Sequence, residues 1–90
     1  MRSRTTAKFW KAYEGLPEHV RRQARVAFAI FEANPWHPGL HFKQVHATRE
    51  IFSARVGLTY RALGQRVGDD EIVWFWIGSH ADYDRLIGGF

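Results

Sequence analysis

The chain has 90 residues, 46% of them hydrophobic and none of them cysteine, so we expect one domain with its own core and exclude disulfides, thiolate metal sites and cysteine nucleophiles. Thirteen Lys and Arg against nine Asp and Glu give a net charge of +4, which favours an anionic partner such as nucleic acid or an acidic protein. No apolar stretch is long enough to cross a membrane and no secretion signal follows the basic first residues, so we expect a cytoplasmic protein.

Two helices are predicted in the first third of the chain. Residues 1–4 read as a frayed tail, after which Thr5 or Thr6 can cap a short helix that ends at Gly15 and Pro17. A second helix is expected over Pro17–Ala33. Both helices carry an apolar stripe, formed by Phe9, Tyr13 and Leu16 in the first and by Val20, Ala24, Ala27, Phe28 and Phe31 in the second. Three arginines lie off the second stripe, either as a solvated face or as a basic patch: Arg21, Arg22 and Arg25.

The remaining chain is typical of strands. The period changes from helical to alternating, which predicts strands over Leu40–Val45, Ile51–Val56, Thr59–Val67 and Glu71–Ile77. The links between these strands are short, so we expect antiparallel neighbours. A short final helix is expected over Ala81–Ile87. The predicted fold class is α+β, with two N-terminal helices packed on a four-stranded antiparallel sheet and a short C-terminal helix, in one domain over residues 1–90.

The sheet face that the two helices leave uncovered is predicted to be cationic. Lys43, Arg55 and Arg61 alternate with the core positions, His41 lies nearby, and His80 follows the last strand. The arginines are either the polar half of amphipathic strands or a site for an anion. Trp74 and Trp76 are expected on one side of the last strand, either in the core or as stacking platforms for bases. Cations with exposed aromatics suit single-stranded nucleic acid, and cations with a histidine suit RNA cleavage.

Other kinds of site find little support in the sequence. His37 and His41 lie across a Pro-Gly loop and have no carboxylates at metal-binding spacing, so we expect no metal site. No glycine-rich phosphate loop and no Ser-His-Asp arrangement is recognisable, and we expect no cofactor.

Two segments resemble the RelE/ParE superfamily of bacterial toxin–antitoxin toxins. Arg55-Val-Gly-Leu-Thr-Tyr-Arg61 is similar to a family segment that spans a strand turn. Trp76-Ile-Gly-Ser-His-Ala-Asp-Tyr83 is similar to the family's apolar last strand, which ends in Gly-x-His with a tyrosine nearby. The helical stretch from Leu16-Pro17 to Asn34-Pro35 also resembles the short toxins of this group. The resemblance extends over about Phe9 to Ile87.

The resemblance implies an antitoxin that wraps the toxin and blocks its site, and it implies one of two activities. RelE-like members cleave mRNA in the ribosomal A site by attack of a 2′-OH on the adjacent phosphate, whereas ParE-like members inhibit DNA gyrase without catalytic residues. We expect a type II toxin that is a ribosome-dependent mRNA endoribonuclease, an mRNA interferase. Gyrase inhibition is the alternative, and so is a non-toxic member that only binds an acidic partner protein.

Site roles follow from the resemblance and from the predicted cationic face. His80 is expected to act as general acid or base, and Arg61 and Arg55 to stabilise the phosphorane. Lys43 and His41 are expected to hold backbone phosphates, and Tyr83 or Trp76 to stack on a base. The expected partners are a cognate antitoxin and mRNA on the ribosome, or alternatively DNA gyrase, with no membrane involved.

Overall fold

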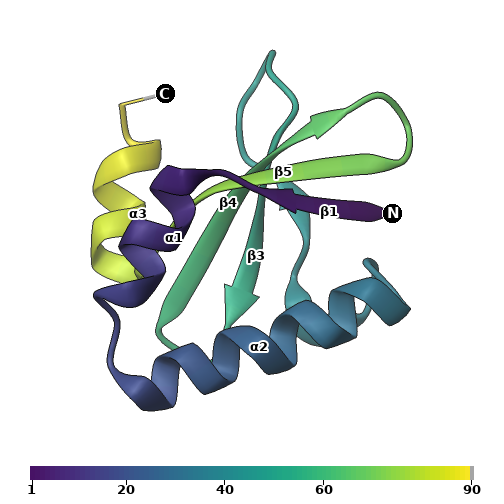
Figure 1. Ribbon diagram of the computed structural model, residues 1–90. Helices are drawn as coiled ribbons and strands as arrows, with labels where there is room; N and C mark the ends of the chain where they lie inside the picture. Colours follow the sequence, from purple (N-terminus) through teal and green to yellow (C-terminus); the bar gives the residue numbers. More distant parts are fainter. Residues whose placement is uncertain (90) are drawn as a thin grey trace.

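Three helices and five strands make up the computed structural model, which describes residues 1–89. The elements follow in the order β1 (Arg2–Thr5), α1 (Ala7–Glu14), α2 (Glu18–Ala33), a short 3-10 helix (Pro38–Leu40), β2 (Lys43–Gln44), β3 (Ile51–Val56), β4 (Tyr60–Val67), β5 (Glu71–Ser79) and α3 (His80–Ile87). The strands form one sheet in the order β1-β5-β4-β3-β2. Figure 1 shows α2 running along one side of the sheet, with α1 and α3 near the end where β5 finishes. The predicted α+β class is confirmed, with one strand more than expected.

The two N-terminal helices begin and end where the sequence predicts. Thr6 caps α1, because its Oγ1 accepts a hydrogen bond from the Phe9 amide at 3.1 Å, and Gly15 follows the last turn. Helix α2 starts after Pro17 and ends at Asn34, with an Arg22–Glu18 ion pair of 3.3 Å on its exposed side. Of the predicted stripe, Val20 and Phe31 are buried, whereas Phe28 is 42% exposed.

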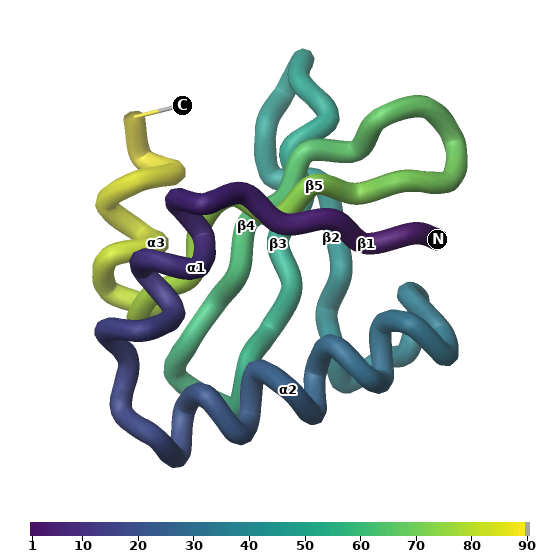
Figure 2. Tube along the Cα trace, in the orientation of Figure 1, coloured from purple at the N-terminus to yellow at the C-terminus, as the bar shows by residue number. Residues whose placement is uncertain are grey.

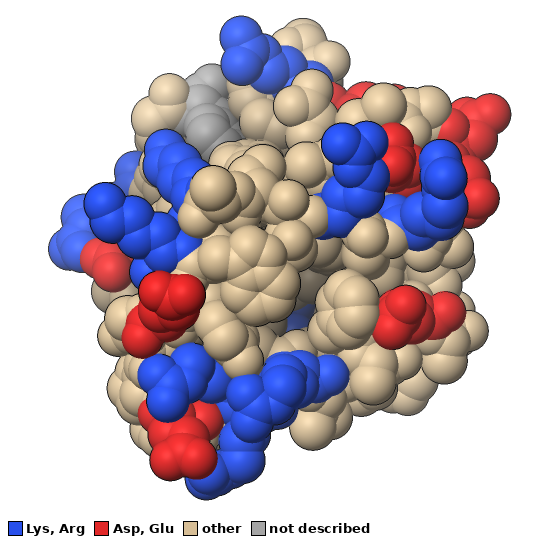
Figure 3. Space-filling view, in the orientation of Figure 1, with Lys and Arg blue, Asp and Glu red and all other residues tan. Residues whose placement is uncertain are grey.

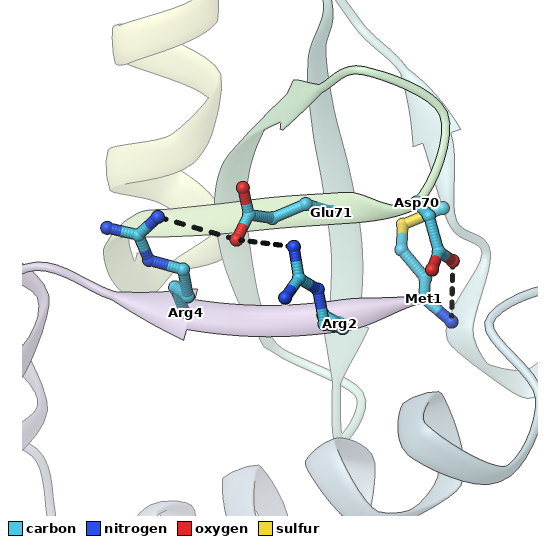
Figure 4. Close-up of polar contacts among 5 residues, drawn as sticks. All are labelled: Met1, Arg2, Arg4, Asp70 and Glu71. Atoms are coloured by element: carbon cyan, nitrogen blue, oxygen red, sulfur yellow. Dashed lines mark hydrogen bonds and ion pairs between the residues drawn. The ribbon is translucent and has the colours of Figure 1, made fainter.

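Strand β1 corrects the prediction that residues 1–4 form a frayed tail. It runs parallel to β5 at the edge of the sheet, and the Arg2 amide donates to the Asp70 carbonyl at 2.7 Å. Figure 4 shows Arg2 and Arg4 both directed at the Glu71 carboxylate, at 3.8 and 3.4 Å. The Met1 ammonium group lies 3.4 Å from Asp70 Oδ1. Strand β1 is held by its backbone pairing with β5 and by these ion pairs. Its sequence has no alternation of apolar and polar residues, and for that reason the strand was not predicted.

Strand β2 is much shorter than the predicted Leu40–Val45. Pro38–Leu40 forms a 3-10 helix, and His41 then adopts a left-handed conformation with φ of 47°. A left-handed residue cannot continue a strand, so β2 begins only at Lys43. Leu40 and Phe42 still reach the core, where both are buried.

A β-bulge in β5 places Trp74 and Trp76 on opposite faces of the sheet. Leu63 pairs with Trp76 and Gly64 with Trp74, so Phe75 is an extra residue in the ladder. Trp74 therefore packs against Phe31 of α2, at a ring distance of 5.3 Å. The expectation that both tryptophans share one side is wrong, because it assumed unbroken alternation.

The sheet has apolar packing on both faces. The face under α1 and α2 holds the larger core, which includes Phe31, Phe42, Phe52, Ile72 and Trp74. On the opposite face Tyr83 of α3 packs with Ile51 and Leu63. The second face is therefore partly covered, where the sequence predicted an open one. Figure 2 shows why: the chain turns directly from β5 into α3, which folds back beside the sheet. In residues 1–89 no helix is long and apolar enough to span a bilayer.

Candidate active site

Arg55 and Arg61 lie directly opposite each other on β3 and β4. Their Cα atoms are partners in the antiparallel ladder, so both side chains leave the same face of the sheet, the face away from α2. Both residues are half-buried. Like charges in such a pair repel each other by about 0.2–1 kcal/mol. The fold thus places two cationic side chains opposite each other on one face, at a cost that a bound anion would relieve.

No carboxylate on the adjoining strands neutralises this arginine pair. Strands β2, β3 and β4 contain Lys43, Arg55, Arg61 and Arg66 but neither Asp nor Glu. Arg61 Nη1 donates to its neighbour's carbonyl, that of Tyr60, at 2.9 Å. Arg55 Nε is buried, and no acceptor in the described chain lies within hydrogen-bonding distance of it. Neither Arg55 nor Arg61 forms an ion pair within residues 1–89, so their guanidinium groups can donate to a phosphate at this surface.

His41 joins the arginine pair from the loop before β2. Its Nε2 atom lies 3.3 Å from Arg55 Nη1, and its ring is exposed. The left-handed backbone at His41 is unusual for a residue with a side chain, and it aims the imidazole back across the sheet towards β3. The sequence-predicted residues Arg55, Arg61 and His41 therefore lie together.

Lys43 lies one row along the same face. Its ladder partner is Ser53, and its side chain is exposed. Lys43 is therefore placed where it could contact an extended anionic chain passing over the arginine pair. In residues 1–89 neither an ion pair nor a hydrogen bond links its side chain to another residue.

His80 occupies the first position of α3. Ser79 caps this helix by accepting from the Asp82 amide at 3.1 Å, and the His80 amide donates to the Thr59 carbonyl at 2.7 Å. The imidazole Nε2 lies 3.4 Å from Asp84 Oδ2, one helical turn on, so Asp84 orients the ring. Within the described residues no hydrogen bond joins His80 to Arg55 or Arg61. Sequence reasoning missed Asp84, although its i+4 spacing from His80 could have indicated it.

Tyr83 does not fit the stacking role predicted for it. Only 5% of the residue is exposed, and its hydroxyl donates to Ser53 Oγ at 3.3 Å beneath α3. The His80 ring lies over it, with ring centroids 6.0 Å apart and an interplanar angle of 21°. Tyr83 therefore supports the His80 ring from below and offers no free face to a base. Ser53, its buried partner, was also missed, because a serine in a strand gives no distinctive signal.

Trp76 is half-buried on the same face as the arginine pair. Gly78, the ladder partner of Arg61, has no side chain, and the indole lies over it: a Cβ at position 78 would be 2.6 Å from Trp76 Cζ2. Trp76 thus packs beside Arg61, with part of its surface open to solvent. No group of three or more His, Asp or Glu side chains suitable for a metal ion occurs in residues 1–89.

Comparison with known proteins agrees with this fold. The RelB–RelE antitoxin–toxin complex from Methanococcus jannaschii is similar over 92% of this chain and 96% of its own, with a TM-score of 0.73 and 18% identity. The RelBE2 toxin–antitoxin complex from Mycobacterium tuberculosis matches 90% of this chain and 92% of its own, with a TM-score of 0.66 and 28% identity. YafQ from Escherichia coli matches 92% and 98%, with a TM-score of 0.71 and 11% identity. No curated protein sequence matches.

These structures define the class: a small α+β protein with the RelE/ParE fold. A family model described as the ParE-like toxin domain matches residues 18–85, most of the chain. The chain therefore belongs to the ParE-like toxin domain family, the toxins of toxin–antitoxin systems.

Proposed function

We propose that this toxin is a ribosome-dependent endoribonuclease that cuts mRNA and is held inactive by a cognate antitoxin. The observation that carries the proposal is the cross-strand Arg55–Arg61 pair with His41 beside it, on strands that contain no carboxylate. A phosphodiester passing over this face meets several donors with fixed positions. That arrangement is suited to a reaction in which negative charge builds up on phosphate oxygens.

The chemistry is an internal displacement on the RNA itself. The ribose 2′-oxygen loses its proton and attacks the adjacent phosphorus, and the bond from phosphorus to the 5′-oxygen breaks. The products are a 2′,3′-cyclic phosphate and a 5′-hydroxyl, so neither water nor a metal ion is consumed. The protein must stabilise the extra charge of the phosphorane and move two protons, one from the 2′-hydroxyl and one to the leaving oxygen.

The residues divide this work according to their positions. Arg61 and Arg55 stabilise the phosphorane, and His41 and Lys43 hold the neighbouring phosphates. His80, oriented by Asp84, acts as general acid or base at the end of the same face. Trp76 offers its open edge to a base, while Tyr83 supports the His80 ring.

Gyrase inhibition is the second candidate, and two observations favour it. The matching family model is that of ParE-like toxins, and the His80 ring contacts Asp84 and Tyr83, with no hydrogen bond to Arg55 or Arg61 in residues 1–89. A toxin that acts by binding alone needs no proton transfer at His80. A third possibility is a member that binds its acidic partner without being toxic.

Expression of the full chain in a bacterial host, followed by primer extension on host mRNAs, separates these activities. We expect in-frame codon cuts with the wild type and with Arg22→Gln, a matched control on the exposed side of α2. Arg61→Gln should reduce cutting by about 100-fold or more, since it removes a fixed charge from the transition state. His80→Ala should reduce it by about 100-fold as well. Arg61→Gln should stay folded, because it also removes the repulsion with Arg55.

Each alternative has its own result. Growth arrest with intact mRNA and induced DNA damage would overturn the nuclease and support gyrase inhibition. A chain that causes no arrest, yet binds the product of the adjacent reading frame, would support the binding-only candidate.

A further inference from the structure

A pocket opens beside the end of β5, between the loop that joins α1 to α2 and the first turns of α3. Its volume is about 590 Å³, which is within the range of small-molecule pockets and is large enough for a nucleotide base. Strand β1 pairs with β5 only as far as Trp74. Beyond that point residues 76–79 of β5 line the pocket.

The pocket adjoins the candidate active site at Gly78. Gly78 is the ladder partner of Arg61, and it lines the pocket. Arg61 Nη1 donates to the Tyr60 carbonyl at 2.9 Å, and Tyr60 lines the pocket as well. Because the Cα atoms of ladder partners are only about 5 Å apart, a phosphate at Arg61 and a base in the pocket can belong to the same nucleotide or to adjacent ones.

The apolar part of the lining suits a flat aromatic ring. Leu16 and Pro17 contribute from the loop between the helices, and Trp76 contributes from β5. The Trp76 indole is half-buried, and an indole is one of the ring systems on which nucleotide bases stack. Stacking alone does not distinguish the bases, because each of them has a π-face. Any selectivity of this pocket must therefore come from its polar groups.

The charged groups of the pocket come from one face of α3. Asp82 and Arg85 line the pocket, and Arg85 Nη2 donates to Asp82 Oδ1. His80 and Asp84 pair with each other on the opposite face of the same helix, because the helix turns by one residue in 3.6. Figure 3 shows Lys and Arg side chains next to Asp and Glu side chains on the side of the molecule where α1 and α3 lie in Figure 1. The pocket thus presents a carboxylate acceptor beside guanidinium donors.

This combination matches the polar edge of guanine. Guanine carries two adjacent N–H donors, at N1 and N2, followed by the acceptor O6. A carboxylate such as that of Asp82 can accept from both donors, while a guanidinium such as that of Arg85 donates to O6. Adenine and cytosine have a ring acceptor next to their amino group, and uracil has a single N–H between two carbonyl oxygens. A carboxylate therefore accepts only one hydrogen bond from each of these bases and meets an acceptor beside it.

We infer that this pocket binds a guanine base of the RNA next to the cleaved phosphate, with Asp82 and Arg85 as specificity-determining residues and Trp76 as the stacking surface. The inference rests on the proposed function, since it takes RNA as the substrate. An ion pair that only stabilises α3 is the competing explanation for Asp82 and Arg85, which are three residues apart on the helix. Such a pair has no effect on which base lies beside a cut.

Mapping the cut sites in host mRNAs after expression of the full chain tests the base preference. We expect guanine next to the cut about tenfold more often than any other base, because a well-placed bidentate pair gives at least that discrimination. Asp82→Asn should bring guanine to within about twofold of the other bases, because the amide sets a donor against one of the two guanine N–H groups. Asp69→Asn makes the same change at an exposed residue of the β4–β5 turn and should keep the preference.

A second pair of variants tests the guanidinium group. Arg85→Gln should lower the guanine preference by about threefold or more, since O6 loses its charged donor. Arg22→Gln on the exposed side of α2 is the matched control and should leave the preference unchanged. Thermal unfolding of each variant shows whether it is folded, and Arg85→Gln keeps the test decisive if Asp82→Asn is not.

The outcomes separate this inference from the proposed function. Cuts without a guanine preference, or a preference that survives in both Asp82→Asn and Arg85→Gln, would show that the pocket assignment is wrong while the nuclease stands. If the wild type does not cut mRNA, the proposed function fails, and titration with guanosine 5′-monophosphate decides about the pocket. NMR signals of the Gly78 amide and the Trp76 indole that shift with this nucleotide, and not with adenosine 5′-monophosphate, would support a guanine pocket. Signals that shift with neither nucleotide, or equally with both, would overturn it.

Discussion

Whether an aromatic or charged side chain in this protein can contact a substrate depends on how far it is buried. The sequence predicts that burial for some residues and not for others. Alternation along β3 and β4 correctly placed Arg55 and Arg61 on one face, because both strands are regular there. The role of Tyr83 could not be read in the same way. A tyrosine on a short helix is either exposed or buried, depending on how that helix packs, and here α3 folds back so that the ring lies beneath His80.

The Tyr83–Ser53 hydrogen bond should contribute to stability and not to substrate binding. Tyr83→Phe leaves Ser53 Oγ buried without its donor, so we expect a loss of about 1 kcal/mol in the free energy of unfolding, measured by urea denaturation. Combining it with Ser53→Ala should restore part of the loss, because both polar partners are then absent. RNA cutting below the melting temperature should be unchanged in Tyr83→Phe. A large loss of cutting in a folded variant would show that the hydroxyl reaches the substrate.

Among the elements, those with a strong internal pattern were predictable and those fixed by their neighbours were not. The cap at Thr6 and the apolar stripe on α2 gave both helices to within a residue or two. Strand β1 has the sequence Arg-Ser-Arg-Thr, and it is a strand only because β5 provides a ladder and Glu71 a counter-charge. Strand β2 was overpredicted, because Leu40 and Phe42 alternate in sequence although His41 between them is left-handed.

Proline substitutions test the register of β1. Arg4→Pro removes an amide that points towards β5, so we expect it to lower the free energy of unfolding by more than about 1 kcal/mol. Ser3→Pro removes an outward amide and should cost clearly less, although it also perturbs the weak Trp74 Nε1 contact with Ser3 Oγ at 3.4 Å. Thermal unfolding of the two variants gives the comparison. Equal losses at both positions would contradict the parallel register.

Across the whole molecule, the two faces of the sheet have different characters. One face carries the arginine pair and is partly covered by α3. The other carries the basic N-terminal elements and an apolar cavity of about 620 Å³, whose walls include Ala24 and Phe28 of α2 and Trp74 of β5. The composition gives the net charge of +4, and the sequence shows that residues 1–33 carry all of that excess. Only the structure shows that several of these residues line one cavity. The cavity itself could not be predicted, since the stripe on α2 looks complete in sequence.

The unfilled cavity should lower the stability of the free protein, so a substitution that fills part of it should raise the free energy of unfolding. Ala24→Leu adds apolar volume inside it, so we expect a gain of about 0.5–2 kcal/mol in the free energy of unfolding, measured by urea denaturation. Ala29→Leu on the exposed side of α2 is the control and should change stability little. A loss of stability in Ala24→Leu would mean that the cavity is closed in solution and that the added side chain is overpacked.

The bulge at Phe75 also affects how distant relatives are compared. Before Phe75 the even-numbered residues of β5 face the helices, and after it the odd-numbered ones do, as with Ile72 and Ile77. A relative without the extra residue aligns correctly only with a one-residue gap at this point. Without the gap, residues from opposite faces are matched, and at identities of 11–28% such a shift still looks acceptable because both faces of β5 are apolar. Alignments of this family are therefore better anchored on Arg61 and Gly78, which are ladder partners, than on the tryptophans.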